Sequence, residues 1–181
     1  GRVLVGLPPC LACLADKIDG EVSDFYLEAK ARNLMPEVPA CDEGVKAART
    51  LAAAGIPFAA SGIISRKRAD DFCEAYMNGL QDRIDKDLDA GQAAMALHMP
   101  VGRIDAHLDP VLDERRKSAP IETISAAYRV LIGRVGVSTA KMIHRDLKRR
   151  LNSARWDLLA AHKAVKPFCV FTFEPASQDK K

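Results

Sequence analysis

The sequence predicts an α/β protein built on a parallel sheet of about five strands. Short apolar runs alternate with longer helical stretches along the 181 residues, and this alternation is typical of parallel sheets whose strands are joined by helices. The length and 48% hydrophobic content fit one globular domain and exclude a disordered chain. Five strands suit either an open sheet or a piece of a (β/α) barrel, because a closed eight-stranded barrel needs about 250 residues.

The N-terminal part predicts two strands and a helix. Residues 2–7 form an apolar run that ends at Pro8 and Pro9, which indicates a buried first strand. Residues 11–32 have helical periodicity. Residues 34–38 then form a second short strand.

The middle of the chain has clear helix boundaries. Asp42 is the expected N-cap of an alanine-rich helix, and Gly55 is its expected end. Residues 56–64 follow as the third strand, and Ser65 is the expected cap of a long helix over 66–90. The apolar residues of that helix at core spacing are Phe72, Ala75, Tyr76, Leu80 and Ile84.

The C-terminal part predicts two more strands, one within residues 93–104 and one over 168–173. Helices are expected over 110–117 and, as a long pair with interruptions at Gly133 and Gly136, over 121–163. No linker or repeat separates these elements. We therefore expect one domain over residues 1–176 and a polar tail over 177–181.

The net charge of +3 is small, but a basic stretch lies near the C-terminus. Residues 129–166 contain ten basic side chains and two acidic ones. This pattern favours a solvated helix face. The alternative is an anionic partner such as nucleic acid or a charged membrane surface, with contacts over 141–155.

Cysteine usage argues against a secreted disulfide framework, because the five cysteines are odd in number and no signal peptide is present. Cys10 and Cys13 form a CxxC motif after the first strand, where a helix N-terminus lowers a thiol pKa in redox proteins. Two buried structural thiols are the simpler interpretation. The four histidines are scattered, so we expect neither a metal site nor a cofactor.

Several motifs occur in a fixed order along the chain. Residues 33–44 read NLMPEVPACDEG, residues 55–65 read GIPFAASGIIS, and AYMNGL and VGRID follow at 75–80 and 101–105. In this order they resemble the transaldolases, (β/α)₈-barrel enzymes that move a three-carbon unit between sugar phosphates through a lysine imine. The opening GRVLVGLPPCLA and the later Arg155–Trp156 and KPF segments extend the resemblance over nearly the whole chain. It implies a partial or degenerate barrel that covers the third to seventh strands of the family.

The departures from the family pattern concern its chemistry. The imine-forming lysine of the family falls on Glu37, and the glutamate that serves its proton-transfer water falls on Gly6. An imine needs an amine nucleophile, which a carboxylate cannot supply. A family serine falls on His98, and Arg103 alone keeps a recognisable role, as a phosphate or anion contact. An ion pair of Arg103 with Asp105 or Glu37 is the simpler interpretation.

These residues lead to the hypothesis of a catalytically inactive transaldolase-like protein with no catalytic residues. It would act as a structural or accessory subunit whose partner proteins cover the open sheet edges. The alternatives are an active sugar-phosphate-binding enzyme of the transaldolase type and a CxxC dithiol redox protein. We expect no membrane span and an intracellular location. The missing Met at position 1 suggests a chloroplast or mitochondrial protein after removal of a leader.

Overall fold

A single parallel sheet organises the chain. The computed structural model describes residues 2–6, 15–31, 33–119 and 122–173. Five parallel strands pair in chain order, so that β1 and β5 stand at the two ends of the sheet. The strands are β1 (Val3–Val5), β2 (Leu34–Pro39), β3 (Phe58–Ser61), β4 (Met95–Met99) and β5 (Phe168–Phe171). A parallel sheet whose consecutive strands are neighbours, with helices between them, has the arrangement of half a (β/α) barrel. The predicted partial barrel is therefore confirmed.

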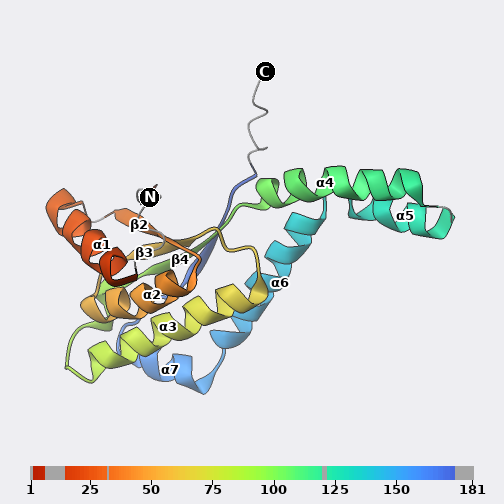
Figure 1. Ribbon diagram of the computed structural model, residues 1–181. Coiled ribbons are helices and arrows are strands. Elements are labelled where there is room, and N and C mark those ends of the chain that lie inside the picture. The colour runs from red at the N-terminus through yellow and green to blue at the C-terminus, as the bar shows by residue number, and fades with distance from the viewer. Residues whose placement is uncertain (1, 7–14, 32, 120–121, 174–181) are drawn as a thin grey trace.

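Seven helices accompany the sheet in the described part of the chain. They are α1 (Ala15–Ala29), α2 (Asp42–Ala54), α3 (Arg66–Ile84), α4 (Val101–Ser118), α5 (Glu122–Leu131), α6 (Val135–Arg150) and α7 (Ala154–Ala161). Helices α2 and α3 pack closely on one another beside the sheet, whereas α4 and α5 form a hairpin that extends away from it (Figure 1). No described helix has both the length and the apolar character needed to cross a membrane.

The two faces of the sheet bury different side chains because successive strand residues point to opposite sides. The convex face carries Val38, Phe58, Leu97 and Met99, which pack with the buried sides of the helices into the main core. The concave face carries a smaller apolar cluster. Its buried members are Met35, Ala59, Ala94 and Ala96.

The helix boundaries test the predicted caps. Gly55 ends α2 with φ +79°, and Ser65 caps α3 by accepting a hydrogen bond from the Arg68 backbone N–H, as expected. The prediction for Asp42 is wrong by one residue. Cys41 is the N-cap, with its Sγ accepting from the Gly44 N–H at 3.4 Å, and Asp42 begins the helix.

Other boundaries differ more. Helix α3 ends at Ile84, six residues before the predicted end, because a turn and a short 3₁₀ segment over Ala90–Gln92 lead into β4. Helix α4 starts at Val101 and contains Pro110, which was expected to begin a helix. Pro110 is exposed, so water can satisfy the carbonyl group that its ring leaves without a donor.

The interruption expected at Gly133 is confirmed, since Gly133 has φ +67° between α5 and α6, but the region 121–163 holds three helices, α5, α6 and α7, rather than a pair. The expectation of a buried first strand is corrected. Strand β1 is not buried, since Val3 is 53% exposed. An end strand of an open half-barrel is covered on fewer sides than an inner strand. The predicted tail over 177–181 lies outside the described residues.

Candidate functional site

The concave face of the half-barrel becomes polar at the carboxyl ends of its strands. Lower down, Met35, Ala59 and Ala96 make a small apolar floor. Two residues further along each strand, and so on the same face, β2 carries Glu37, β3 carries Ser61 and β4 carries His98, while Thr172 directly follows β5. The carboxyl ends of parallel strands form the mouth of a (β/α) barrel, where active sites of that architecture lie.

Glu37 and His98 form the centre of this polar group. Glu37 Oε1 lies 3.1 Å from His98 Nδ1, and the two side chains are only 23% and 17% exposed. Strand β3 separates their strands, and the register that pairs Ser61 with His98 sets the imidazole level with the strand ends. The carboxylate at position 37 therefore has a close partner for its charge.

Two hydroxyl groups complete the contacts of the imidazole. Ser61 Oγ lies 3.2 Å from His98 Nδ1, and Thr172 Oγ1 lies 3.2 Å from His98 Nε2. The backbone of Thr172 is held on both sides, because its N–H donates to Met99 O and its carbonyl accepts from the Gly102 N–H. The ring thus connects a carboxylate on one nitrogen with a hydroxyl on the other, an arrangement that can hold or move a proton.

Gly6 lies beside Glu37 at the same mouth. A Cβ atom placed on Gly6 would lie 3.6 Å from Glu37 Oε2. The two positions at which the sequence lacks the lysine and the glutamate of the resembled family are therefore neighbours in space. With glycine at position 6, His98 is the polar side chain that contacts the Glu37 carboxylate among the described residues.

Arg103 is not part of this group. It lies on the first turn of α4 and is exposed, and its backbone N–H donates to Pro100 O. Neither proposed ion pair of Arg103 is present: Glu37 contacts His98, and Asp105 accepts a hydrogen bond from the Gly136 N–H at 2.7 Å. The simpler interpretation of Arg103 is wrong, and its role as an anion contact stays a prediction.

The lysines lie away from the strands in the described part of the chain. Lys46 lies on α2, Lys67 lies on the first turn of α3, and Lys30 directly follows α1. Lys67 is 84% exposed and pairs with Asp71 on its own helix. None of the five described strands contains a lysine.

Three of the five cysteines, Cys41, Cys73 and Cys169, lie in the described part of the chain. Cys10 and Cys13 lie outside the described residues, so the redox hypothesis stays a prediction. Burial raises the pKa of the Cys73 thiol to about 12 and that of Cys169 to about 11, which keeps both protonated and unreactive at neutral pH. No cluster of three or more His, Cys, Asp or Glu side chains suited to a metal is found in the described part.

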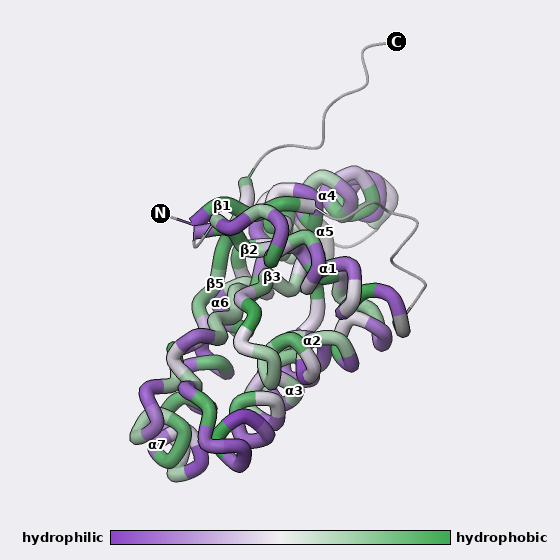
Figure 2. Tube along the Cα trace, turned by 90° about the vertical axis from the view of Figure 1, so that its left-hand side faces the viewer, coloured by the Kyte–Doolittle hydropathy of each residue, from purple (hydrophilic) through white to green (hydrophobic). Residues whose placement is uncertain are grey.

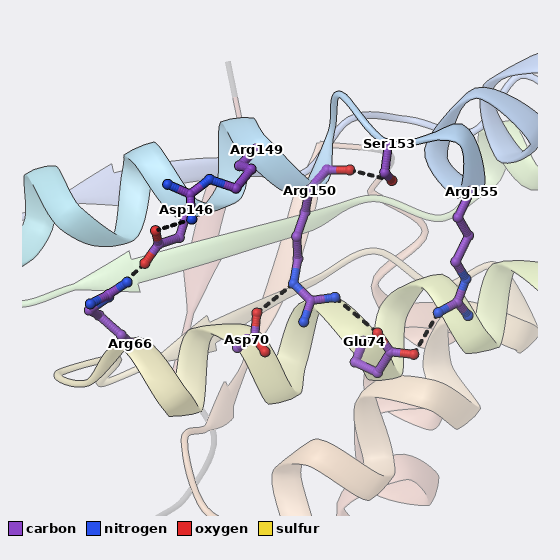
Figure 3. A network of polar contacts seen from close by, with 8 residues as sticks. All are labelled: Arg66, Asp70, Glu74, Asp146, Arg149, Arg150, Ser153 and Arg155. Atoms are coloured by element: carbon purple, nitrogen blue, oxygen red, sulfur yellow. Dashed lines mark hydrogen bonds and ion pairs between the residues drawn. The ribbon is translucent and has the colours of Figure 1, made fainter.

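The basic stretch is partly neutralised by acidic residues of α3. Arg150 of α6 binds Asp70 and Glu74, and Arg155 of α7 shares Glu74 (Figure 3). At the other end of the network, Asp146 of α6 pairs with Arg66 at 2.6 Å. These ion pairs hold α6 and α7 against α3, which the sequence pattern did not indicate.

The geometry defines a class of protein: a partial (β/α) barrel with five described strands and a polar group at the mouth. Comparison with known proteins finds distant similarity to transaldolases. The chain is 27% identical to a transaldolase of Trichodesmium erythraeum and 26% identical to transaldolase 2 of a Nostoc strain, over 91% of its length in each case. A transaldolase of Frankia alni is 27% identical over 92% of the chain. The protein is a distant relative of the transaldolases.

The similarity covers only part of each relative's length. The chain spans less than half the length of these relatives, 43% in each of the three. No family model matches it.

Proposed function

We propose that this protein is a transaldolase relative without imine chemistry that serves as a structural or accessory subunit of a larger protein assembly. The supporting observation is the pairing of Glu37 with His98 at the mouth of the half-barrel. The position that the resemblance assigns to the imine-forming amine holds a carboxylate, and a hydrogen-bonded histidine faces it. The group that forms the covalent bond in the resembled family is thereby replaced by one that cannot form it.

The other residues at the mouth of the half-barrel also support the absence of imine chemistry. The described strands contain no lysine that could substitute for the missing amine, and Gly6 supplies no side chain for proton transfer. An imine-forming lysine must also lose its proton near neutral pH, which burial near the reacting carbonyl promotes. The exposed Lys67, paired with Asp71, has the opposite environment.

The subunit role is supported by the open sheet. Strands β1 and β5 each pair along one edge only within the described residues. Val3 is 53% exposed and Phe173, just beyond β5, is 64% exposed. Uncovered parallel strands with apolar side chains favour association with further protein.

Borohydride trapping tests the loss of imine chemistry. The chain is incubated with a ketose phosphate and borohydride, and the intact mass is measured beside that of a transaldolase such as the Trichodesmium enzyme. We expect a covalent adduct on the transaldolase and none on this chain. An adduct on any lysine of this chain would overturn the proposal.

Native size tests the subunit role. The free chain has a mass of 19.7 kDa, so size-exclusion chromatography of an extract from its source, with antibody detection, separates it from any assembly. We expect elution in a larger particle. Elution at the size of the free chain contradicts the subunit role. An organellar location stays a prediction.

A second candidate function rests on the order of carboxylate, imidazole and hydroxyl from Glu37 through His98 to Thr172. A proton-transfer enzyme acting on a sugar phosphate without an imine needs such a base. It predicts exchange of a carbon-bound hydrogen of the ketose phosphate with deuterated water, lost in His98→Ala. Absence of exchange above the rate in buffer dismisses it.

A further inference from the structure

A surface groove lies between α6 and the convex side of β5, on the opposite side of the sheet from Glu37 and His98. Its volume is about 430 Å³, and its walls are Val137, Ala140, Lys141, His144, Arg145, Lys148, Phe171 and Phe173. The six residues from α6 recur at spacings of three and four and therefore share one face of the helix. Helix α6 and β5 lie next to each other at one margin of the molecule (Figure 2), and the His144 ring meets the edge of Phe171 with ring centroids 6.5 Å apart.

The groove lies where the repeating architecture would place another element. In a (β/α) barrel, the helix that follows a strand packs on the convex side beside the preceding helix. Within the described residues, Phe171 of β5 and Phe173, which is 64% exposed, form the apolar wall of this flank of the sheet.

The described side chains that line the groove carry only positive charge. Lys141, Arg145 and Lys148 are exposed, and no ion pair is found for them among the described residues. Asp146, the acidic residue of α6, points its carboxylate to Arg66 on α3 instead. Arg150, on the same helix, is neutralised by Asp70 and Glu74. The unneutralised positive charge of α6 thus gathers along the groove.

His144 lies between the apolar and the basic residues of the groove, and its ring packs on Phe171. The apolar walls and the basic rim therefore occur in one groove.

We infer that this groove docks an acidic amphipathic helix of a partner protein, an inference that rests on the proposed subunit function. The three cations lie at positions i, i+4 and i+7 and span about 10 Å along α6. A partner helix with Asp or Glu at the same spacing matches all three. Its neighbouring aliphatic side chains enter between Val137, Phe171 and Phe173.

The test uses a stapled helical peptide as the probe, with leucines along one face and glutamates on its flank at the spacing of the three cations. Binding to the 181-residue chain is measured by fluorescence anisotropy at low salt. The double variant Lys141→Glu/Arg145→Glu is expected to weaken binding by about tenfold or more. The matched control Lys46→Glu/Lys86→Glu changes the net charge equally at exposed sites away from the groove and is expected to stay within about twofold.

Two further measurements separate docking in the groove from attraction by charge alone. Phe173→Ser removes an exposed apolar wall and is expected to weaken binding about fivefold or more, since hydrophobic anchors carry much of the affinity of helix-in-groove contacts. A peptide with lysines in place of the glutamates is expected to bind the Lys141→Glu/Arg145→Glu variant better than the unchanged chain. Circular dichroism and urea unfolding verify that each variant is folded.

The inference is overturned if both double variants weaken binding equally, or if a peptide with alanines in place of its leucines binds as tightly. It is also overturned if the chain binds vesicles with anionic lipid through Lys141 and Arg145 and the peptide does not compete. Each of these outcomes concerns the groove alone. Borohydride trapping and native size still decide the proposed function independently.

Discussion

Glu37 on β2 and His98 on β4 meet across the intervening strand β3, with Oε1 and Nδ1 3.1 Å apart. Their side chains lie on the concave face, where an apolar floor and two hydroxyl groups surround them. The site therefore has the position of a barrel active centre, and it holds a carboxylate, an imidazole and two hydroxyl groups.

Glu37→Lys is expected to give a chain that borohydride traps with a ketose phosphate, because it restores an amine at a partly shielded position of the mouth. The wild-type chain is expected to give no adduct. Glu21→Lys, which adds a lysine on the exposed side of α1, is the matched control and is expected to give none. Mass spectrometry reads out the adduct, and its absence from Glu37→Lys would show that position 37 does not face a sugar-sized site.

Gly55→Ala is expected to lower the free energy of unfolding by about 2 kcal/mol or more. Gly55 has φ +79°, and an added Cβ would lie 2.7 Å from the Arg83 guanidinium carbon. That guanidinium is buried and donates to Ala53 O, Asp89 O and the Gln92 side chain, so it cannot yield easily.

Gly62→Ala is the control for backbone strain alone, since Gly62 has φ +84° and an added Cβ would meet open space. Its expected cost is about 1 kcal/mol. Urea unfolding measures both variants. Equal losses would mean that the contact with Arg83 adds nothing.

Tyr76→Phe is expected to destabilise the fold by about 1–2 kcal/mol. The buried hydroxyl of Tyr76 donates toward Ala93 O at 3.2 Å and Val165 O at 2.9 Å, and the second contact ties α3 to the segment before β5. Its removal leaves buried carbonyl groups without this donor. Tyr26→Phe, at a partly buried ring, is the comparison in thermal and urea unfolding, and a cost as large there would contradict the assignment.

Glu74→Gln is expected to reduce stability by up to about 1 kcal/mol at neutral pH and to have little effect in acid. The hydrogen bond from Arg155, and then that from Arg150, lowers the pKa of the Glu74 carboxyl from its ordinary 4.5. A lowered folded-state pKa gives stability above the unfolded-state pKa, which is lost as the pH falls through the folded-state value.

Urea unfolding of wild type and Glu74→Gln between pH 7 and pH 3 therefore should give a difference that is constant above about pH 5 and shrinks below 4.5. Glu28→Gln on the exposed side of α1 serves as the control. A difference that persists unchanged at pH 3 would assign the effect to packing rather than charge.

Cys73 and Cys169 are expected to resist a thiol reagent in the folded chain at pH 8, because burial raises their pKa values to about 12 and about 11. Both should react after denaturation. Cys10→Ser/Cys13→Ser provides the comparison, because the redox hypothesis predicts that this variant loses a fast-reacting thiol. Rapid labelling of Cys73 in the folded chain, located by peptide mapping, would contradict its buried position.

The sequence by itself determined the elements that local chemistry specifies. Alternating apolar runs located the strands, and Gly55 and Ser65 ended and began helices as expected, because these signals act within a few residues. The order of the motifs indicated the transaldolase relationship and placed Glu37 where an amine was expected. Local signals failed at Pro110, where exposure to water tolerates a proline inside α4.

Only the tertiary structure decided which side chains meet. Glu37, Ser61, His98 and Thr172 are far apart in the chain and come together through the register of parallel strands. Period-two alternation shows which residues share a face, but the curvature of the sheet decides which face becomes the mouth. The structure likewise divided the basic stretch into cations neutralised by α3 and cations that line the groove, because charge pairing depends on the packing of helices that the sequence does not specify.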